Sequence, residues 1–150
     1  MPKNAIHIVF GYWINRSHQN VRWFGAQNLS ITPGWAVGYF FVPIFNLFRP
    51  YVAMSELHKS SHNPIAWTKS DSGGLTSLWW ALWILAGFLG QIAFRIAVGA
   101  DTLPEIQAST VAQLVSDVAE IPLSLVAFFL VSSIQKAQQR WVDQDSIQKT

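Results

Sequence analysis

Two long stretches of the chain carry no charged side chain and are almost wholly apolar. Residues 72–94 contain no Asp, Glu, Lys or Arg, and neither do residues 121–135 (IPLSLVAFFLVSSIQ). About 20 apolar residues in a helix span the hydrocarbon core of a bilayer. We therefore predict transmembrane helices over residues 75–99 and 118–136, the second extended back from Ile121 to reach spanning length.

Two shorter apolar runs precede them. Residues 35–48 make a run of about 14 residues, a length that favours re-entrant or interfacial segments over full spans. Prolines break it, and Pro43 removes a backbone donor in its middle. We therefore predict a re-entrant or interfacial segment over residues 31–50, with a motif formed by Pro33, Gly34, Pro43, Asn46, Arg49 and Pro50. Residues 5–14 are apolar over half a span, which predicts a partial helix over residues 5–24.

The distribution of Lys and Arg predicts an orientation. Lys and Arg favour the cytoplasmic side of a membrane protein. They occur in residues 49–74 and after residue 135, whereas residues 99–117 contain neither. We expect residues 49–74 and the C-terminal tail, residues 137–150, to be cytoplasmic and the loop before residue 117 to lie outside. Basic residues flank the 31–50 segment on both sides, which favours a re-entrant or interfacial path over a span.

The connecting segments also show helical signals. Pro50 at a first turn predicts a short helix to Ser61, which Asn63-Pro64 ends. Thr102 and Glu105 fit a capping box that starts an outer amphipathic helix over residues 102–117. That helix either lies along the outer surface or continues into the 118–136 helix as one long rod.

Composition supports a single membrane domain over residues 1–150. Hydrophobic residues make up 51% of the chain and charged residues 12%, against about 25% charged in soluble domains. The net charge of +2 and the dispersed Lys and Arg argue against a nucleic-acid binder. The absence of Cys excludes disulfides and thiolate sites. We therefore predict an all-α, multi-pass membrane fold whose main partner is the lipid bilayer.

Three strings resemble a known family. They are NVRWFGA at residues 20–26, TPGWAVGYFFVPIFNLFRPYVAMSELHKSS at residues 32–61, and WWALW at residues 79–83. Together they are similar to the domain-of-unknown-function 4328 family of bacterial membrane proteins. The resemblance implies a multi-pass helical protein of the bacterial inner membrane, and it implies no activity.

The chain departs from that family pattern in two ways. Members usually carry more hydrophobic chain ahead of the matched region, so we expect that this chain is either a short member or N-terminally truncated. His58 stands where an aromatic residue is common in the family, which weakens any functional role for it.

One cluster suggests metal chemistry. His58 and His62 lie four residues apart, so they would share a helix face, and Glu56 is nearby. A zinc site needs three or four convergent ligands, and Asn63-Pro64 ends the helix at once. A solvated polar face is the preferred interpretation, and we predict no catalytic, cofactor-binding or metal site.

Arg95 is the charged residue inside the 75–99 helix. A charge within a membrane helix needs a partner or must reach the headgroups. Asp117 and Glu120 lie on a polar stripe with Gln113 and Ser124. We predict an intramembrane ion pair of Arg95 with Glu120 or Asp117. If residues 102–136 form one rod, Arg95 would instead lie level with residues 109–113.

Three functions remain open from the sequence. The first is a non-enzymatic integral membrane protein that acts through helix contacts, with itself as a homo-oligomer or with another membrane protein. Small residues favour such close contacts, as in the stripe Ala86, Gly90, Ala93 and Ala97. The second is a subunit of an oligomeric channel or transporter, suggested by the broken 31–50 segment. The third is a membrane-bound, metal-dependent enzyme using the two histidines and Glu56.

Overall fold

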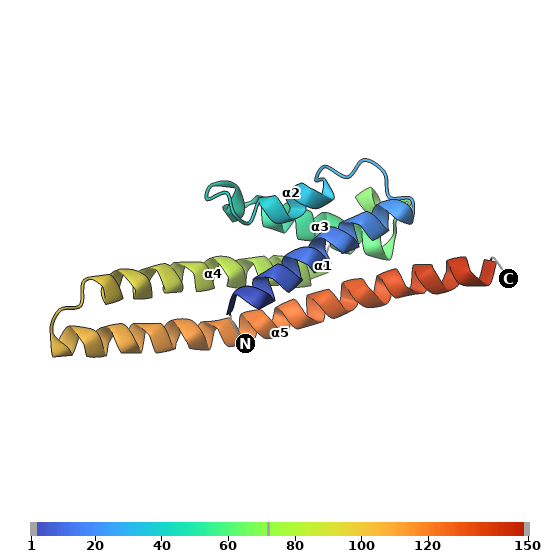
Figure 1. The fold of residues 1–150 in the computed structure, drawn as a ribbon. Coiled ribbons are helices and arrows are strands. Elements are labelled where there is room, and N and C mark those ends of the chain that lie inside the picture. The colour runs from blue at the N-terminus through green and yellow to red at the C-terminus, as the bar shows by residue number, and fades with distance from the viewer. Residues whose placement is uncertain (1–2, 72, 149–150) are drawn as a thin grey trace.

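The computed structural model describes residues 3–71 and 73–148, and every regular element in those residues is a helix (Figure 1). The two longest helices are α4 (Gly73–Val98) and α5 (Leu103–Gln148). Both are long and apolar enough to cross a membrane. The predicted all-α fold class with two long apolar helices is therefore confirmed.

Helices α4 and α5 form an antiparallel hairpin (Figure 1). The turn between them is held by Glu105, whose Oε2 accepts hydrogen bonds from the backbone N–H of Asp101 at 3.0 Å and of Thr102 at 2.9 Å. Further along, a Cβ added to Gly90 would lie 3.6 Å from Ser116 Oγ, and Ala93 is 1% exposed. Part of the predicted small-residue stripe therefore packs within the chain, against α5.

Helix α5 is one rod, the second of the two arrangements that the sequence leaves open. It covers the 102–117 and 118–136 segments and continues through most of the predicted tail. Pro122 lies inside it without ending it. At about 1.5 Å per residue, 46 residues make a helix of about 70 Å, so α5 extends well beyond α4 at its C-terminal end (Figure 1).

The proline-rich stretch runs out along α4 and returns. Helix α2 (Pro33–Gly38) starts at Thr32, whose Oγ1 accepts from the Trp35 N–H at 3.4 Å. The chain turns over through a short 3-10 helix, η1 (Phe45–Leu47), and comes back as α3 (Arg49–His62). At the turn, Trp80 Nε1 donates to the Leu47 carbonyl at 3.1 Å. The predicted short helix from Pro50 is confirmed, and Asn63 follows its last residue.

Helix α1 (Lys3–Trp23) packs against α2 and α3. Gly11 permits the contact with α2, because a Cβ there would lie 3.2 Å from Val37 Cγ1. A second short 3-10 helix, η2 (Trp67–Lys69), precedes α4. The buried core gathers side chains from α1, α2, α3, α4 and α5, among them Ile14, Ala36, Met54, Leu57, Trp79, Leu130 and Ile134.

The hairpin has two unlike halves. We call residues 86–120, on either side of the turn, the distal half. The base is the remainder of α4 and α5 together with helices α1, α2 and α3, which lie over it (Figure 1). In the distal half α4 and α5 pack mainly on each other, and the tip of the proline-rich stretch, Asn46 and Leu47, borders its edge at Gly87.

Candidate functional site

The base contains a polar network centred on Gln138. This side chain is 7% exposed. Its Nε2 donates to the Ser61 Oγ at 3.0 Å and to the Ser17 carbonyl at 3.2 Å. Its Oε1 accepts from Asn20 Nδ2 at 3.0 Å. Because Ser17 and Asn20 belong to α1 and Ser61 to α3, one carboxamide of α5 joins three helices.

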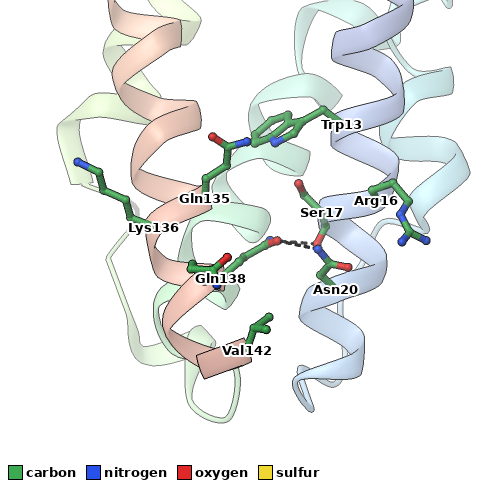
Figure 2. A pocket seen from close by; sticks show the side chains of 9 residues that line it. Trp13, Arg16, Ser17, Asn20, Gln135, Lys136, Gln138 and Val142 are labelled. Carbon is green, nitrogen blue, oxygen red and sulfur yellow. Dashed lines mark hydrogen bonds between the residues drawn. The ribbon is translucent and has the colours of Figure 1, made fainter. Parts of the chain in front are cut away.

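A groove between α1 and α5 opens beside this network (Figure 2). It encloses about 490 Å³ and carries no acidic side chain among its lining residues. Arg16 and Lys136 stand on its two rims and point away from it (Figure 2). The remaining lining residues are Trp13, Ser17, Asn20, Gln135, Gln138, Gln139 and Val142.

Sequence reasoning missed this network and groove. It assigned residues after 136 to a tail, whereas the structure continues α5 through them and packs them against α1 and α3. Trp141 also joins the C-terminal part of α5 to α3, because its Nε1 donates to the Ser61 carbonyl at 2.9 Å. The signal that could have found it is Ala137-Gln138, a small residue and an uncharged polar one.

The two histidines of α3 do share a face, as their spacing predicts. Their ring centroids are 4.4 Å apart. Ser133 Oγ of α5 lies 3.5 Å from His58 Nε2 and 3.4 Å from His62 Nε2. Burial and, secondarily, the charge of His62 lower the pKa of His58 from 6.5 to about 4. His58 therefore favours the neutral imidazole.

Glu56 does not join the histidines. It is 7% exposed, and its carboxylate accepts from the backbone N–H of Ser30 at 3.2 Å and from the Ser30 hydroxyl. In the part of the chain that the structure describes, no group of three His, Cys, Asp or Glu side chains could hold a metal ion. The described residues therefore bring together two of the three ligands that the metal hypothesis needs.

A further histidine is buried in the base. His18 of α1 is 0% exposed, and neither ring nitrogen has a hydrogen bond of regular geometry to the described part of the chain. Burial is the main reason why the pKa of His18 falls from 6.5 to about 4. The charge of Arg22 also lowers it, and the nearby backbone of Ala53 partly opposes the shift.

The residues of the predicted re-entrant motif lie along the outward and returning arms of the proline-rich stretch, α2 and α3. Pro33 and Gly34 open α2, Arg49 and Pro50 open α3, and Pro43 lies in the turn between them. The Arg49 guanidinium lies 5.3 Å from the centre of the Tyr39 ring. Asn46 borders a hollow of about 240 Å³ against α4, and its buried Oδ1 has no hydrogen-bond partner among the residues that the structure describes.

The three charges of the predicted ion pair lie in the distal half, and all are exposed. The contact of Gly90 with Ser116 sets the register of the hairpin. Five residues further along α4, Arg95 is level with Val111 of α5, as the one-rod arrangement predicts. Asp117 is then about 9 Å and Glu120 about 14 Å away along the hairpin axis. Because α5 does not break, the structure does not bring Arg95 together with either carboxylate within the chain.

Asp117 and Glu120 instead line a shallow hollow with Ile121, Ser124 and Leu125. The Asp117 carboxylate accepts from Gln113 Nε2 at 2.9 Å. Ser124 Oγ donates to the Glu120 carbonyl at 2.8 Å. Among the described residues, no Lys or Arg makes an ion pair with either carboxylate. A stripe of polar side chains thus runs along the outside of α5, beside exposed apolar residues such as Leu114 and Val118.

Comparison with known protein families shows to which family the chain belongs. A family model described as "Domain of unknown function (DUF4328)" matches residues 4–136. The chain belongs to the DUF4328 family. No curated protein and no solved structure matches it.

The DUF4328 match includes most of the features above. Both histidines of α3, the re-entrant motif and the three charges of the distal half all lie within residues 4–136. Gln138 and Trp141 lie just beyond it, so the match includes the α1 and α3 partners of the polar network but not its α5 donors.

Proposed function

We propose that this DUF4328 protein is a non-enzymatic, multi-pass protein of the inner membrane that acts through helix contacts, with itself or with another membrane protein. In this arrangement α4 and α5 cross the bilayer. Residues 49–74 and the C-terminal end of α5 are cytoplasmic.

The apolar surface of the hairpin supports insertion. In the most apolar window of 18 residues, 6% of α4 and 11% of α5 is buried. A soluble protein rarely exposes a continuous apolar surface of this extent. The exposed apolar side chains of the distal half include Phe88, Ile92, Phe94, Val98, Leu103, Ile106, Val111, Leu114 and Val118.

The arrangement of the re-entrant stretch supports the orientation. Its two arms start and end at the base, beside Lys59 and Lys69, while its tip reaches the middle of α4. The opposite end of the hairpin carries Asp101 and no Lys or Arg between residues 99 and 117. Basic residues at one end and none at the other favour a cytoplasmic base.

The observation that carries the helix-contact proposal is the polar stripe on α5. It consists of Gln113, Asp117, Glu120 and Ser124, all exposed on the helix that also carries exposed apolar residues such as Leu114 and Val118. An ionised Asp at the centre of a membrane helix costs about 3 kcal/mol when it faces lipid. A second helix that covers the stripe removes this cost, whereas a catalytic role would need a site that binds substrate.

The stripe can be tested with single cysteines, because the chain contains none. Ser124→Cys lies on the stripe. Val115→Cys is the matched control, because nine residues correspond to about two and a half turns and place it on the opposite side of α5. In native membranes, we expect a lipid-soluble maleimide to label the Val115→Cys variant several-fold faster than the Ser124→Cys variant. Equal labelling would show that lipid faces both sides, and the proposal would be abandoned.

A channel or transporter subunit is the second candidate, favoured by the unpartnered Asn46 Oδ1 beside the hollow on α4. Non-helical backbone at membrane depth commonly lines a water-filled cavity. This function predicts ion or solute flux from vesicles that contain the purified protein, reduced by Asn46→Leu. Vesicles without flux would leave the helix-contact function as the one supported.

A further inference from the structure

We propose that the partner of the α5 stripe is a second copy of this chain in the same orientation, with Arg95 of one copy paired to Asp117 of the next. This inference rests on the proposed function and names its partner. It gives an ion partner to two charges of the distal half that have none among the described residues of their own chain.

Neither charge has an ionic partner among residues 3–71 and 73–148. The Arg95 side chain makes no hydrogen bond or ion pair to any of these residues, and the Asp117 carboxylate is bonded to the uncharged Gln113. The register of the hairpin separates them by about 9 Å along its axis. An arginine and an aspartate at similar depth, each open to lipid, are complementary surfaces for two copies that share one orientation.

The lean of side chains along a helix closes much of the remaining difference in depth. Each Cα–Cβ bond tilts toward the N-terminus of its helix. In α4 this tilt carries the side chain of Arg95 toward the base, and in antiparallel α5 it carries that of Asp117 toward the turn. The two side chains therefore lean toward one common depth. Gln113, about 3 Å from the level of Arg95, lies beside the same contact.

The two charges also lie on different faces of the hairpin. In the distal half Ala93 is buried against α5, and Arg95 follows two residues later, about 200° round α4, so it points away from α5. Asp117 follows Ser116, which faces α4, and therefore lies on the flank of α5. Because Arg95 and Asp117 lie on separate faces, a two-fold symmetric contact of either face with itself would bring like charges together. The contact is therefore head-to-tail, with the Arg95 face of one copy against the Asp117 face of its neighbour.

Charge exchange between copies tests this contact. The full chain is reconstituted in lipid bilayers, and self-association is measured by energy transfer between labelled copies. We expect Arg95→Asp and Asp117→Arg each to weaken association at least tenfold. An equal mixture of the two variants should restore it, because the introduced aspartate of one copy then meets the introduced arginine of the other. The unchanged pair also forms in the mixture, in the opposite sense.

The matched controls separate a pair between copies from a pair within one copy. Arg140→Glu, an exposed charge reversal at the other end of α5, should leave association unchanged. A chain that carries both exchanges should also associate normally. Rescue by that double variant without rescue by the mixture would place the pair inside one chain and overturn the inference. Helical circular dichroism of each variant confirms that it is folded.

The outcome also distinguishes this inference from the proposed function. If the wild-type chain does not associate while Ser124→Cys stays protected in native membranes, a different membrane protein covers the stripe. The second-copy inference is then wrong and the helix-contact function stands. If Ser124→Cys is labelled as fast as Val115→Cys, both are wrong.

Discussion

The base and the distal half share helices α4 and α5 but surround the side chains of these two helices in opposite ways. In the base, Leu130 and Ile134 are 0% exposed, and the carboxamide of Gln138 is hydrogen-bonded at both ends. In the distal half, Leu114 and Phe94 are 58% and 62% exposed, and the polar side chains of Gln113, Asp117 and Glu120 are exposed as well. The base is therefore completed by this chain, whereas the distal half depends on what surrounds it.

This difference teaches where the two kinds of stability come from. Burial against other helices in the base contributes packing free energy that a side-chain truncation removes. The distal half is stabilised by the transfer of its apolar surface into lipid. Lipid is fluid and fills the space that a truncated side chain leaves, so a truncation there costs little packing free energy. Mutations of the same chemical type should therefore have large effects at one end of the hairpin and small effects at the other.

The largest effect is expected from truncating a buried leucine in the base, compared with an exposed leucine in the distal half. Leu130, in the base, is 0% exposed, and Leu114, on the same helix in the distal half, is 58% exposed. Leu130→Ala should lower the free energy of unfolding by about 2–5 kcal/mol. Leu114→Ala should change it by about 0.5 kcal/mol or less. Reversible unfolding in detergent micelles measures both, and equal losses would contradict the division into two halves.

The histidines of the base, His18 and His58, make the stability of the folded protein depend on pH. The pKa of His18 falls from 6.5 to about 4 in the folded base, chiefly because it is buried. Between these two values the unfolded chain binds more protons than the folded chain, so stability is lost as pH falls from about 6.5 to about 4. A shift of this size corresponds to at most about 3 kcal/mol for the buried His18. His58 titrates in the same window and adds to the loss.

Replacing the histidine removes this dependence. We expect His18→Leu to flatten the profile of unfolding free energy between pH 7 and 4. It should leave stability at pH 7 equal or higher, because the ring nitrogens of His18 lack regular hydrogen bonds. Thermal unfolding at several pH values measures it, with His58→Gln as the partner variant for the second histidine. A profile as steep as that of the wild type would show that other groups carry the acid sensitivity.

The sequence was informative where the local pattern decides the structure. The charge-free stretches predicted the apolar parts of α4 and α5, and Pro50 and Asn63 marked the two ends of α3. Glu105 fulfilled its capping role because a capping box involves residues only a few positions apart.

The sequence was less informative where distant partners decide the structure. Gln138 is buried because Ser17 and Ser61 bond to it across 121 and 77 positions, which no local pattern reveals. An apolar run looks the same whether it ends at residue 117 or continues as one rod, so the segment boundaries of α5 were left open. The residues of α5 that lie level with Arg95 depend on whether α5 is one rod or two helices.

The smallest expected effect concerns the polar network, which marks the base as a folded core. Gln138→Ala leaves the fully buried Ser61 hydroxyl and the Asn20 amide without their partner and should cost about 2 kcal/mol of unfolding free energy. Gln139→Ala is the matched control, because Gln139 is exposed and its side chain bonds, among the described residues, to Asp143 of its own helix alone. It should change stability by about 0.5 kcal/mol or less. If the two variants lost equal stability, α5 would be held by its apolar side chains alone. The carboxamide of Gln138 would then be a solvated group, and the polar network would not belong to the core that distinguishes the base from the distal half.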